Sequence, residues 1–127
     1  MAVEKEIKGI EEFSDYLDRK GDLHDCMVEL IQWHPEAKSV DIKFLDVNAN
    51  FLGLPEYEGL TPCVMRISDI HEINFNLVNH EGMLRVYEAS ISNADGYGLF
   101  KMLFSPSGSM SLLFADIELL EIKADRN

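Results

Sequence analysis

The chain has 127 residues, of which 46% are hydrophobic and 27% are charged, a composition typical of one globular domain spanning residues 1–127. Its 23 acidic and 11 basic residues give a net charge of −12, which disfavours direct binding to nucleic acid or to an anionic membrane surface. The N-terminal residues lack the apolar core of a signal peptide, and no run approaches the roughly 20 apolar residues of a membrane helix, so we expect a cytoplasmic protein.

The cysteine pattern disfavours a disulfide framework and a zinc site. Cys26 and Cys63 are the two cysteines, and they form no CxxC motif and have no pair of histidines nearby at zinc-ligand spacing. Both lie in apolar stretches. We therefore expect two buried free thiols, a reducing compartment, and no metal ion or other cofactor.

Residues 7–20 carry the spacing of an amphipathic helix, because apolar side chains recur at steps of three and four. These side chains are Ile7, Ile10, Phe13, Tyr16 and Leu17. Acidic residues fill four of the other nine positions, Arg19 and Lys20 suit the negative C-terminal end of a helix, and Gly21 is a natural stop. The pattern predicts that the fold opens with a helix.

Residues 26–34 and 39–47 predict a β-hairpin. The first stretch, CMVELIQWH, is apolar and nearly continuous, which favours a buried strand that ends before Pro35. The second stretch alternates until Leu45 shifts the apolar parity by one, which indicates a bulge or the end of the strand. Residues 35–38 form the turn between the two strands.

A long strand is predicted from Thr61 to Val78, after a packed loop at 48–60 that is rich in glycine, proline and asparagine. Odd-numbered apolar side chains of this strand should face a core, and polar ones should face the solvent. The inward set is Met65, Ile67, Ile73, Phe75 and Leu77. Residues 69–71 interrupt the alternation, which predicts a kink or a tight turn that splits the strand.

The C-terminal third predicts further antiparallel strands. Residues 79–82 read as a polar turn, and 83–91 as a strand that ends at the turn signal NADG. Residues 97–105 and 109–122 flank the short loop at Pro106 and should pair as a hairpin. The second arm is apolar at both parities, as expected of a central strand that is covered on both faces.

These elements together predict an α+β fold. It has an N-terminal helix at about 7–20, a strand-rich region at about 23–122, and a C-terminus that frays at 123–127. Six or seven mainly antiparallel strands, without a βαβ rhythm, should form a curved sheet or a sandwich. The helix should lie over one face or edge of that sheet.

Four histidines are the side chains that could carry chemistry. His24 beside Asp25 is the most enzyme-like pair, because a carboxylate can hold an imidazole in the tautomer that a general base needs. Sequence neighbours in a strand point to opposite faces, so we expect this pair to be structural, at the corner between helix and strand. His34, His71 and His80 could join His24 in a metal site, but their spacing does not support one. We predict no catalytic residue and no metal site.

Acidic residues concentrate on the predicted helix and in the loop at 48–60. The set, called the acidic surface below, is Glu11, Glu12, Asp15, Asp18, Asp22, Glu56 and Glu58. A solvated helix face is the ordinary interpretation of such a run, and the alternative is a surface that steers toward a basic protein partner. Trp33 is either a core residue or an interface anchor, because tryptophan is enriched in both.

The order of elements resembles that of small bacterial immunity-like proteins, which accompany polymorphic or contact-dependent toxins. The residues that carry the resemblance are Leu-His-Asp at 23–25, VMRISDIHEINF at 64–75, and Ser-Pro-Ser-Gly-Ser at 105–109 before SLLFADIELLEI at 111–122. The resemblance implies an acidic inhibitor that occupies the basic substrate face of a toxin, often a nuclease, in the cell that makes both. It implies no catalytic residue.

Two other functions remain open from the sequence. One is a binding or scaffold module that self-associates, as a homodimer for example, through an exposed strand edge, with Trp33 or the last hairpin as the contact. The other is a small hydrolase or lyase that uses histidines in a cup of the curved sheet.

Overall fold

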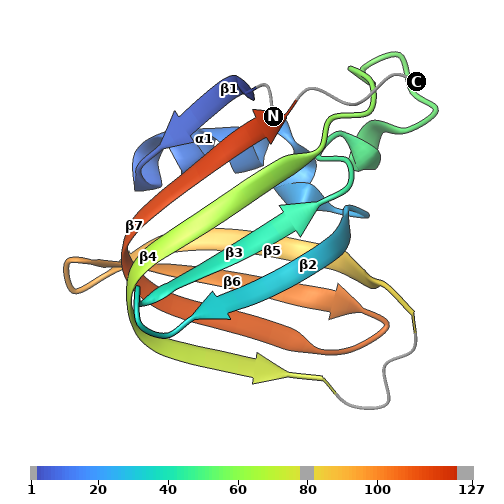
Figure 1. Cartoon of the computed structure of the whole chain (residues 1–127). Coiled ribbons are helices and arrows are strands. Elements are labelled where there is room, and N and C mark those ends of the chain that lie inside the picture. The colour runs from blue at the N-terminus through green and yellow to red at the C-terminus, as the bar shows by residue number, and fades with distance from the viewer. Residues whose placement is uncertain (1–2, 78–81, 123–127) are drawn as a thin grey trace.

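A computed structural model describes residues 3–77 and 82–122 of the chain (Figure 1). The described elements are β1 (Val3–Lys8), α1 (Ile10–Arg19), the 3₁₀ turn η1 (Gly21–Leu23), β2 (Met27–His34), β3 (Ser39–Phe44), the 3₁₀ turn η2 (Ala49–Phe51), β4 (Cys63–Asn76), β5 (Leu84–Ala94), β6 (Tyr97–Ser105) and β7 (Ser109–Ile122). All strand pairs are antiparallel. The predicted α+β class with a dominant antiparallel sheet is confirmed in this broad form.

The start of the chain differs from the prediction, because a strand precedes the helix. Ile7 lies in β1 opposite Leu119 and not in the helix. Gly9 has a φ of 86°, a conformation that glycine adopts without steric cost and that separates β1 from the first helical residue, Ile10. The three-residue step from Ile7 to Ile10 fits a helix by spacing alone, so the periodicity extended the predicted helix too far.

The strands form one sheet in the order β1-β7-β4-β3-β2-β5-β6, and β6 also pairs with β7. The sheet therefore curls until β7, β4, β3, β2, β5 and β6 close a ring (Figure 1). The predicted β6–β7 hairpin is confirmed, with register from Gly98↔Phe114 to Leu103↔Ser109. β7 is central, but its buried side chains alternate, so the expectation of two covered faces is wrong. The join between β2 and β5 is short, with only Met27↔Arg85 and Val28↔Leu84 in register.

Helix α1 covers one end of the concave face of the sheet. Phe13, Tyr16 and Leu17 are buried from the helix. The Phe13 ring meets the Phe100 ring of β6 edge to face at 5.8 Å, a favourable geometry for aromatic pairs. The Tyr16 hydroxyl donates a hydrogen bond to Glu121 Oε2 of β7 at 2.7 Å. These contacts fix the helix, so its acidic residues are left on the outward face.

Strand β4 bends in the middle, where the sequence predicted an interruption, but it does not split. Its pairing with β3 ends at Ile67↔Val40. Asp69 then has a φ of 52°, and the register against β7 shifts between Ile70 and Glu72, as in a β-bulge. Beyond this bend β4 pairs only with β7 and leaves β3 behind (Figure 1).

The bend corrects the predicted core of this strand. Met65 and Ile67, before the bend, are fully buried as predicted. Ile73 is half-buried, whereas Phe75 is 44% exposed and Leu77 is also exposed. The apolar alternation continues through this half of β4. Within the described residues, however, β4 has no neighbouring strand here on the side that β3 occupies before the bend, and these side chains stay partly exposed.

Strand β2 is also more exposed than its apolar sequence predicted. After Val28, no strand within the described residues pairs with β2 on the side away from β3, so this part of β2 is paired with β3 alone. Leu30 is 48% exposed and Trp33 is 60% exposed. Trp33 is therefore not a core residue. The prediction of a buried strand at 26–34 is wrong after Val28.

The turns and loops follow the prediction more closely. The turn at 35–38 joins β2 to β3, β3 ends at Phe44 just before the parity shift, and Asp95-Gly96 joins β5 to β6. The loop at 48–60 packs less well than expected, since Leu52, Leu54 and Leu60 are exposed. The predicted turn at 79–82 lies mostly outside the described residues, and the predicted fraying at 123–127 lies wholly outside them.

Candidate functional site

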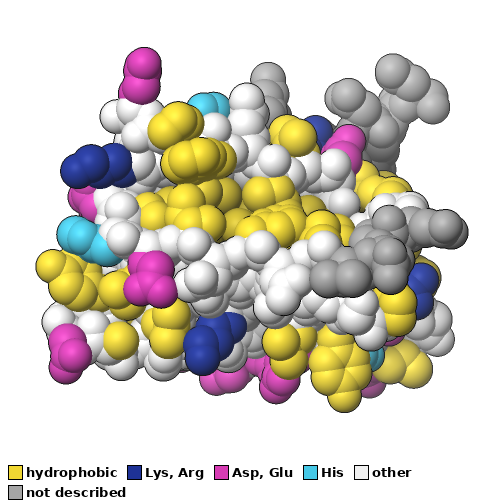
Figure 2. Space-filling view, turned by 90° about the horizontal axis from the view of Figure 1, so that it is seen from below, with side chains coloured by type: hydrophobic (Ala, Val, Ile, Leu, Met, Phe, Trp, Pro, Cys, Tyr) yellow, Lys and Arg dark blue, Asp and Glu magenta, His cyan; other side chains and the backbone are white. Residues whose placement is uncertain are grey.

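An open apolar pocket of about 650 Å³ lies between the β2–β3 hairpin and the bent half of β4. It faces away from α1, and seen from that side hydrophobic side chains form a continuous band across the molecule (Figure 2). The apolar side chains that line it include Ile31, Trp33, Ile70, Ile73, Phe75 and Met110. Because large pockets with apolar linings are the commonest ligand sites, we take this pocket as the candidate site.

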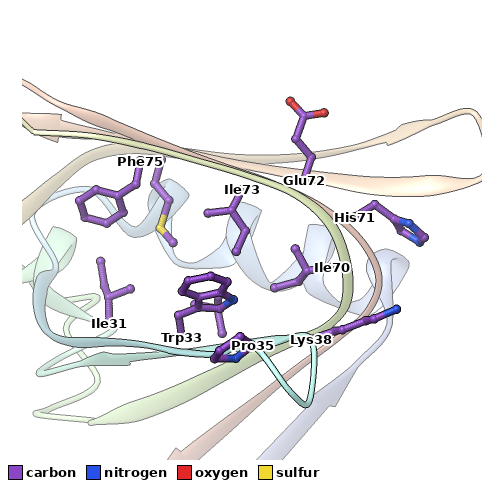
Figure 3. Close-up of a pocket in the computed structure, with 11 residues that line it drawn as sticks. Ile31, Trp33, Pro35, Lys38, Ile70, His71, Glu72, Ile73 and Phe75 are labelled. Atoms are coloured by element: carbon purple, nitrogen blue, oxygen red, sulfur yellow. The ribbon is translucent and has the colours of Figure 1, made fainter.

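Two walls of the pocket come from opposite sides of the curled sheet. Ile31 and Trp33 lie opposite Ile42 and Val40, so they share the inward face of the hairpin. Figure 3 shows them pointing toward Ile70, Ile73 and Phe75 of β4. The further wall is completed by Met110 of β7, which lies opposite Phe75. The separation of β4 from β3 at the bend leaves the space between the walls open.

Polar side chains lie at one end of the pocket. The side chains of Lys38 and His71 lie beyond Ile70 at that end and extend away from the apolar walls (Figure 3). The Ile70 N–H donates a hydrogen bond to the Lys38 carbonyl oxygen at 3.1 Å, so the hairpin turn and the bend of β4 are in direct contact. The His71 ring lies 4.4 Å from the Tyr97 ring. Glu72 points out of the pocket and accepts a hydrogen bond from Asn74 Nδ2 at 2.9 Å.

The acidic surface lies on other parts of the molecule. Its exposed members are Glu11, Glu12, Asp15, Asp18, Glu56 and Glu58, and Asp22 in η1 is partly exposed. Among the described residues, the four helix acids form no ion pair. Glu12 accepts a hydrogen bond from the Lys8 N–H at 2.8 Å. The helix therefore presents a row of carboxylates to solvent.

A buried polar network fixes the loop that carries Glu58 beside the end of α1. Lys20 Nζ, which is buried, donates to Asn48 Oδ1 at 2.6 Å and lies 3.7 Å from Glu58 Oε2. The Tyr57 hydroxyl donates to Asp46 Oδ2 at 2.8 Å. The network holds the loop acid Glu58 beside Lys20, which directly follows α1.

His24 and Asp25 form the corner between η1 and β2. His24 Nδ1 donates a hydrogen bond to the Tyr87 carbonyl oxygen at 2.6 Å, and its Nε2 lies 3.6 Å from Asp25 Oδ1. The Asp25 N–H donates to the Val86 carbonyl oxygen at 2.8 Å. Both residues thus tie the corner to β5, and these contacts agree with the structural role expected of them.

The other histidines have separate surroundings. His34 Nε2 lies 3.3 Å from Asp41 Oδ2 on the neighbouring strand, and His71 contacts Tyr97. His80 lies outside the described residues. Within 3–77 and 82–122, no group of three or more His, Cys, Asp and Glu side chains is placed to hold a metal ion.

Cys26 and Cys63 are free and buried, as predicted. Burial raises the pKa of the Cys26 thiol to about 12 and that of Cys63 well above its ordinary value, since a thiolate would be poorly solvated there. Neither thiol is activated as a nucleophile, because that requires a lowered pKa.

The pocket is the feature that the sequence did not reveal. Ile73 and Phe75 read as ordinary core positions, and Met110 lies in a strand whose apolar pattern gives no hint of an opening. The signal that was present is the break at 69–71 together with an apolar strand that runs on to Trp33. Neither says that the two segments face each other across a gap.

The described part of the chain contains no helix long and apolar enough to cross a membrane. The sequence matches no protein-family model and no curated protein.

Proposed function

We propose that this protein is a non-enzymatic binding protein that neutralises a basic protein partner through its acidic surface. The observation that carries the proposal is the row of exposed helix carboxylates, including Glu11, Asp15 and Asp18, without an ion pair among the described residues. On a chain of net charge −12, such a row attracts a cationic surface over long range and orients it on approach.

The resemblance to immunity-like proteins supports a specific partner, a basic bacterial toxin domain. In this proposal the protein acts in the cytoplasm of the cell that makes the toxin and covers the basic face that would bind the toxin's substrate. Inhibition then needs no chemistry, because occupancy of that face excludes the substrate. The fixed helix and the anchored loop present the carboxylates without first having to be ordered, which lowers the entropic cost of binding.

The test is association with the product of the neighbouring gene, measured as a function of salt. The variant Glu11→Gln/Asp15→Asn/Asp18→Asn removes three charges from α1. The control Glu36→Gln/Asp69→Asn/Glu72→Gln removes three exposed charges from the hairpin turn and the bend of β4. We expect the association rate of the wild type to fall steeply with salt. The helix variant should associate about tenfold more slowly at low salt, and the control should stay within about twofold.

Two outcomes contradict the proposal. A rate that does not depend on salt excludes electrostatic steering as the mechanism. Equal slowing by the helix variant and its control means that overall charge matters and that α1 is not the contact.

Self-association is the second candidate function, and it is favoured by a different observation. Trp33 is 60% exposed beside an open apolar pocket, a setting in which tryptophan acts as an interface anchor. Light scattering over a range of concentrations tests it. A strict monomer at high concentration would remove this candidate, and loss of a dimer in Trp33→Ala would support it.

A further inference from the structure

The outer edge of β2 lacks the charges that protect the outer edge of β1. Within the described sheet β1 pairs with β7 alone, and four of its six residues, VEKEIK, are charged. Charged side chains on an edge strand discourage pairing with another chain. The segment Leu30–His34 of β2, called the open edge below, contains no Asp, Glu, Lys or Arg. No strand among the described residues pairs with its outer side, so an added strand can pair there.

The backbone of the open edge has unused hydrogen-bonding groups on its outer side. The Leu45 N–H donates a hydrogen bond to the Met27 carbonyl oxygen at 3.0 Å, across the β2–β3 ladder. Hydrogen-bonded positions alternate along an antiparallel ladder, so the β3 residues opposite Ile31 and Trp33 turn their backbone groups away from β2. Ile31 and Trp33 therefore turn their own N–H and C=O groups toward the open edge.

We propose that two copies of the chain pair antiparallel along their open edges, about a two-fold axis at Gln32. Ile31 of each copy then lies opposite Trp33 of the other, and their outward backbone groups exchange hydrogen bonds. The proposal rests on self-association, the second candidate function above, and specifies its surface and register. Pairing uses the open edge of both copies, so assembly stops at a dimer.

The side chains of the open edge are complementary to themselves in this register. On the inner face, Trp33 is 60% exposed and points in the same direction as Ile31 (Figure 3). In the dimer it lies beside Ile31 of the other copy, and an aromatic side chain opposite a β-branched one is a favourable cross-strand pair. On the outer face, Leu30 lies opposite His34, and Gln32 lies opposite its own counterpart. None of these pairs opposes two like charges.

The acids that flank the open edge are compatible with the same register. They are Glu29 and Glu36. Glu29 lies opposite Pro35 of the other copy, and Glu36 lies opposite Val28, so no two acids face each other directly. The charge of Glu29 is also compensated within its own chain, because Lys43 Nζ lies 3.5 Å from Glu29 Oε2.

The response to salt distinguishes this dimer from binding to a basic partner. Two copies of net charge −12 repel each other, so added salt should tighten the dimer by at least about twofold, whereas it weakens binding through the acidic surface. Sedimentation equilibrium measures the dimer. Trp33 is the one tryptophan of the chain, and its emission should shift to the blue as protein concentration rises.

The register is tested at Gln32, an exposed side chain that meets its counterpart at the two-fold axis. Gln32→Glu alone and Gln32→Lys alone should each dimerise at least about tenfold more weakly than the wild type, because each places like charges opposite each other. An equimolar mixture of the two variants should form a 1:1 heterodimer at least as tight as the wild-type dimer. The control Asn93→Asp adds a charge at an exposed position on β5 and should stay within about twofold of the wild type.

Hydrogen exchange tests the backbone pairing itself. In dilute protein, where the chain is a monomer, the amides of Ile31 and Trp33 should exchange readily. In concentrated protein their exchange should slow by at least about fivefold, because both amides are then hydrogen-bonded to the second copy. Concentrated Gln32→Glu should show no such slowing. Far-UV circular dichroism checks that each variant is folded.

The outcomes separate failure of this proposal from failure of self-association. A strict monomer at the highest soluble concentration, in high salt, removes both. A dimer that is unaffected by Gln32→Glu, or a mixture of variants that does not associate, removes the open edge as the contact and leaves self-association standing. Slow exchange of Ile31 and Trp33 at every protein concentration also overturns the proposal, since the chain itself would then cover the edge.

Discussion

Trp33 and Val40 are cross-strand partners on the inward face of the β2–β3 hairpin, yet Val40 is buried and Trp33 is 60% exposed. The difference arises because β4 pairs with β3 up to Val40 and then bends away. On this face of the hairpin, one member of a cross-strand pair thus belongs to the core and the other lines the open pocket.

This relationship predicts that two truncations lower the free energy of unfolding by unequal amounts. Trp33→Ala should change the free energy of unfolding by about 1 kcal/mol or less, because 60% of the residue stays exposed to water in the folded protein. Val40→Ala should cost about 1.5–3 kcal/mol, because it removes a fully buried side chain. Urea denaturation followed by circular dichroism measures both. A larger cost for Trp33→Ala would mean that the indole is covered in solution.

The bend in β4 predicts a boundary for charge tolerance along one strand. Ile67→Asp should prevent folding, because it places an unpaired carboxylate in the core. Phe75→Asp should leave a folded protein, because its side chain lies at the open pocket. Circular dichroism and size-exclusion chromatography distinguish the two. If both variants unfold, the second half of β4 belongs to the core after all.

Three buried acids predict a loss of stability at alkaline pH. Burial and the hydrogen bond to Glu121 raise the pKa of Tyr16 above its ordinary value of 10.0, and burial raises the pKa of Cys26 and Cys63 above 9.0. The unfolded chain therefore loses these protons at lower pH than the folded chain. The stability that they contribute is complete below about pH 9 and falls as pH rises, by at most about 1.4 kcal/mol per group and pH unit.

The alkaline loss is measured as the urea midpoint between about pH 8 and pH 11. Tyr16→Phe should weaken its pH dependence, although it lowers stability near pH 7 by about 1–3 kcal/mol, since Glu121 loses a donor. Tyr87→Phe, at an exposed ring, is the matched control and should follow the wild type. A Tyr16→Phe profile parallel to the wild type would show that Tyr16 is not involved.

The pair Asp41 and Arg66 on β3 and β4 predicts a smaller effect at acidic pH. Two hydrogen bonds from Arg66, at 2.8 and 3.2 Å, hold the pKa of Asp41 below its ordinary value of 3.8, and His34 adds to the effect. The unfolded chain is protonated first as pH falls, so the stabilisation is present above about pH 4 and disappears below it.

Asp41→Asn should therefore lower stability near pH 7 by less than about 1 kcal/mol, since Arg66 is exposed and its ion pair is screened. The difference from the wild type should vanish near pH 2. Asp116→Asn, at an exposed position on β7 without an ion pair among the described residues, should show no such pH dependence. A difference that persists at low pH would point to packing and not to charge.

Local signals predicted the parts of this fold that depend on neighbours in sequence. Turn residues at Pro35, Asp95 and Pro106 and the alternation of the flanking strands predicted the hairpins correctly. The boundary at Gly9 was missed, because a step of three residues also occurs by chance between a strand and a helix.

The pocket could not be predicted, for a reason of a different kind. The alternation that places Ile73 and Phe75 on one face is the same whether that face is covered or open. Whether it is covered depends on where β3 ends relative to β4, which is a matter of tertiary arrangement. By contrast, the exposed acids on α1 could be predicted, because an amphipathic helix specifies its own outward face.

The long ladder between β4 and β7, from Cys63↔Glu121 to Asn76↔Ser109, has a consequence for motion. It runs, with one bulge between Ile70 and Glu72, from the end that carries α1 to the pocket, while the β2–β3 hairpin beyond Val28 is attached through one strand (Figure 1). Amide hydrogens of β4 and β7 should therefore exchange with solvent slowly, and outer-edge amides of β2 should exchange sooner. The hairpin is then a hinged wall, which can change the width of the pocket while the rest of the sheet stays closed.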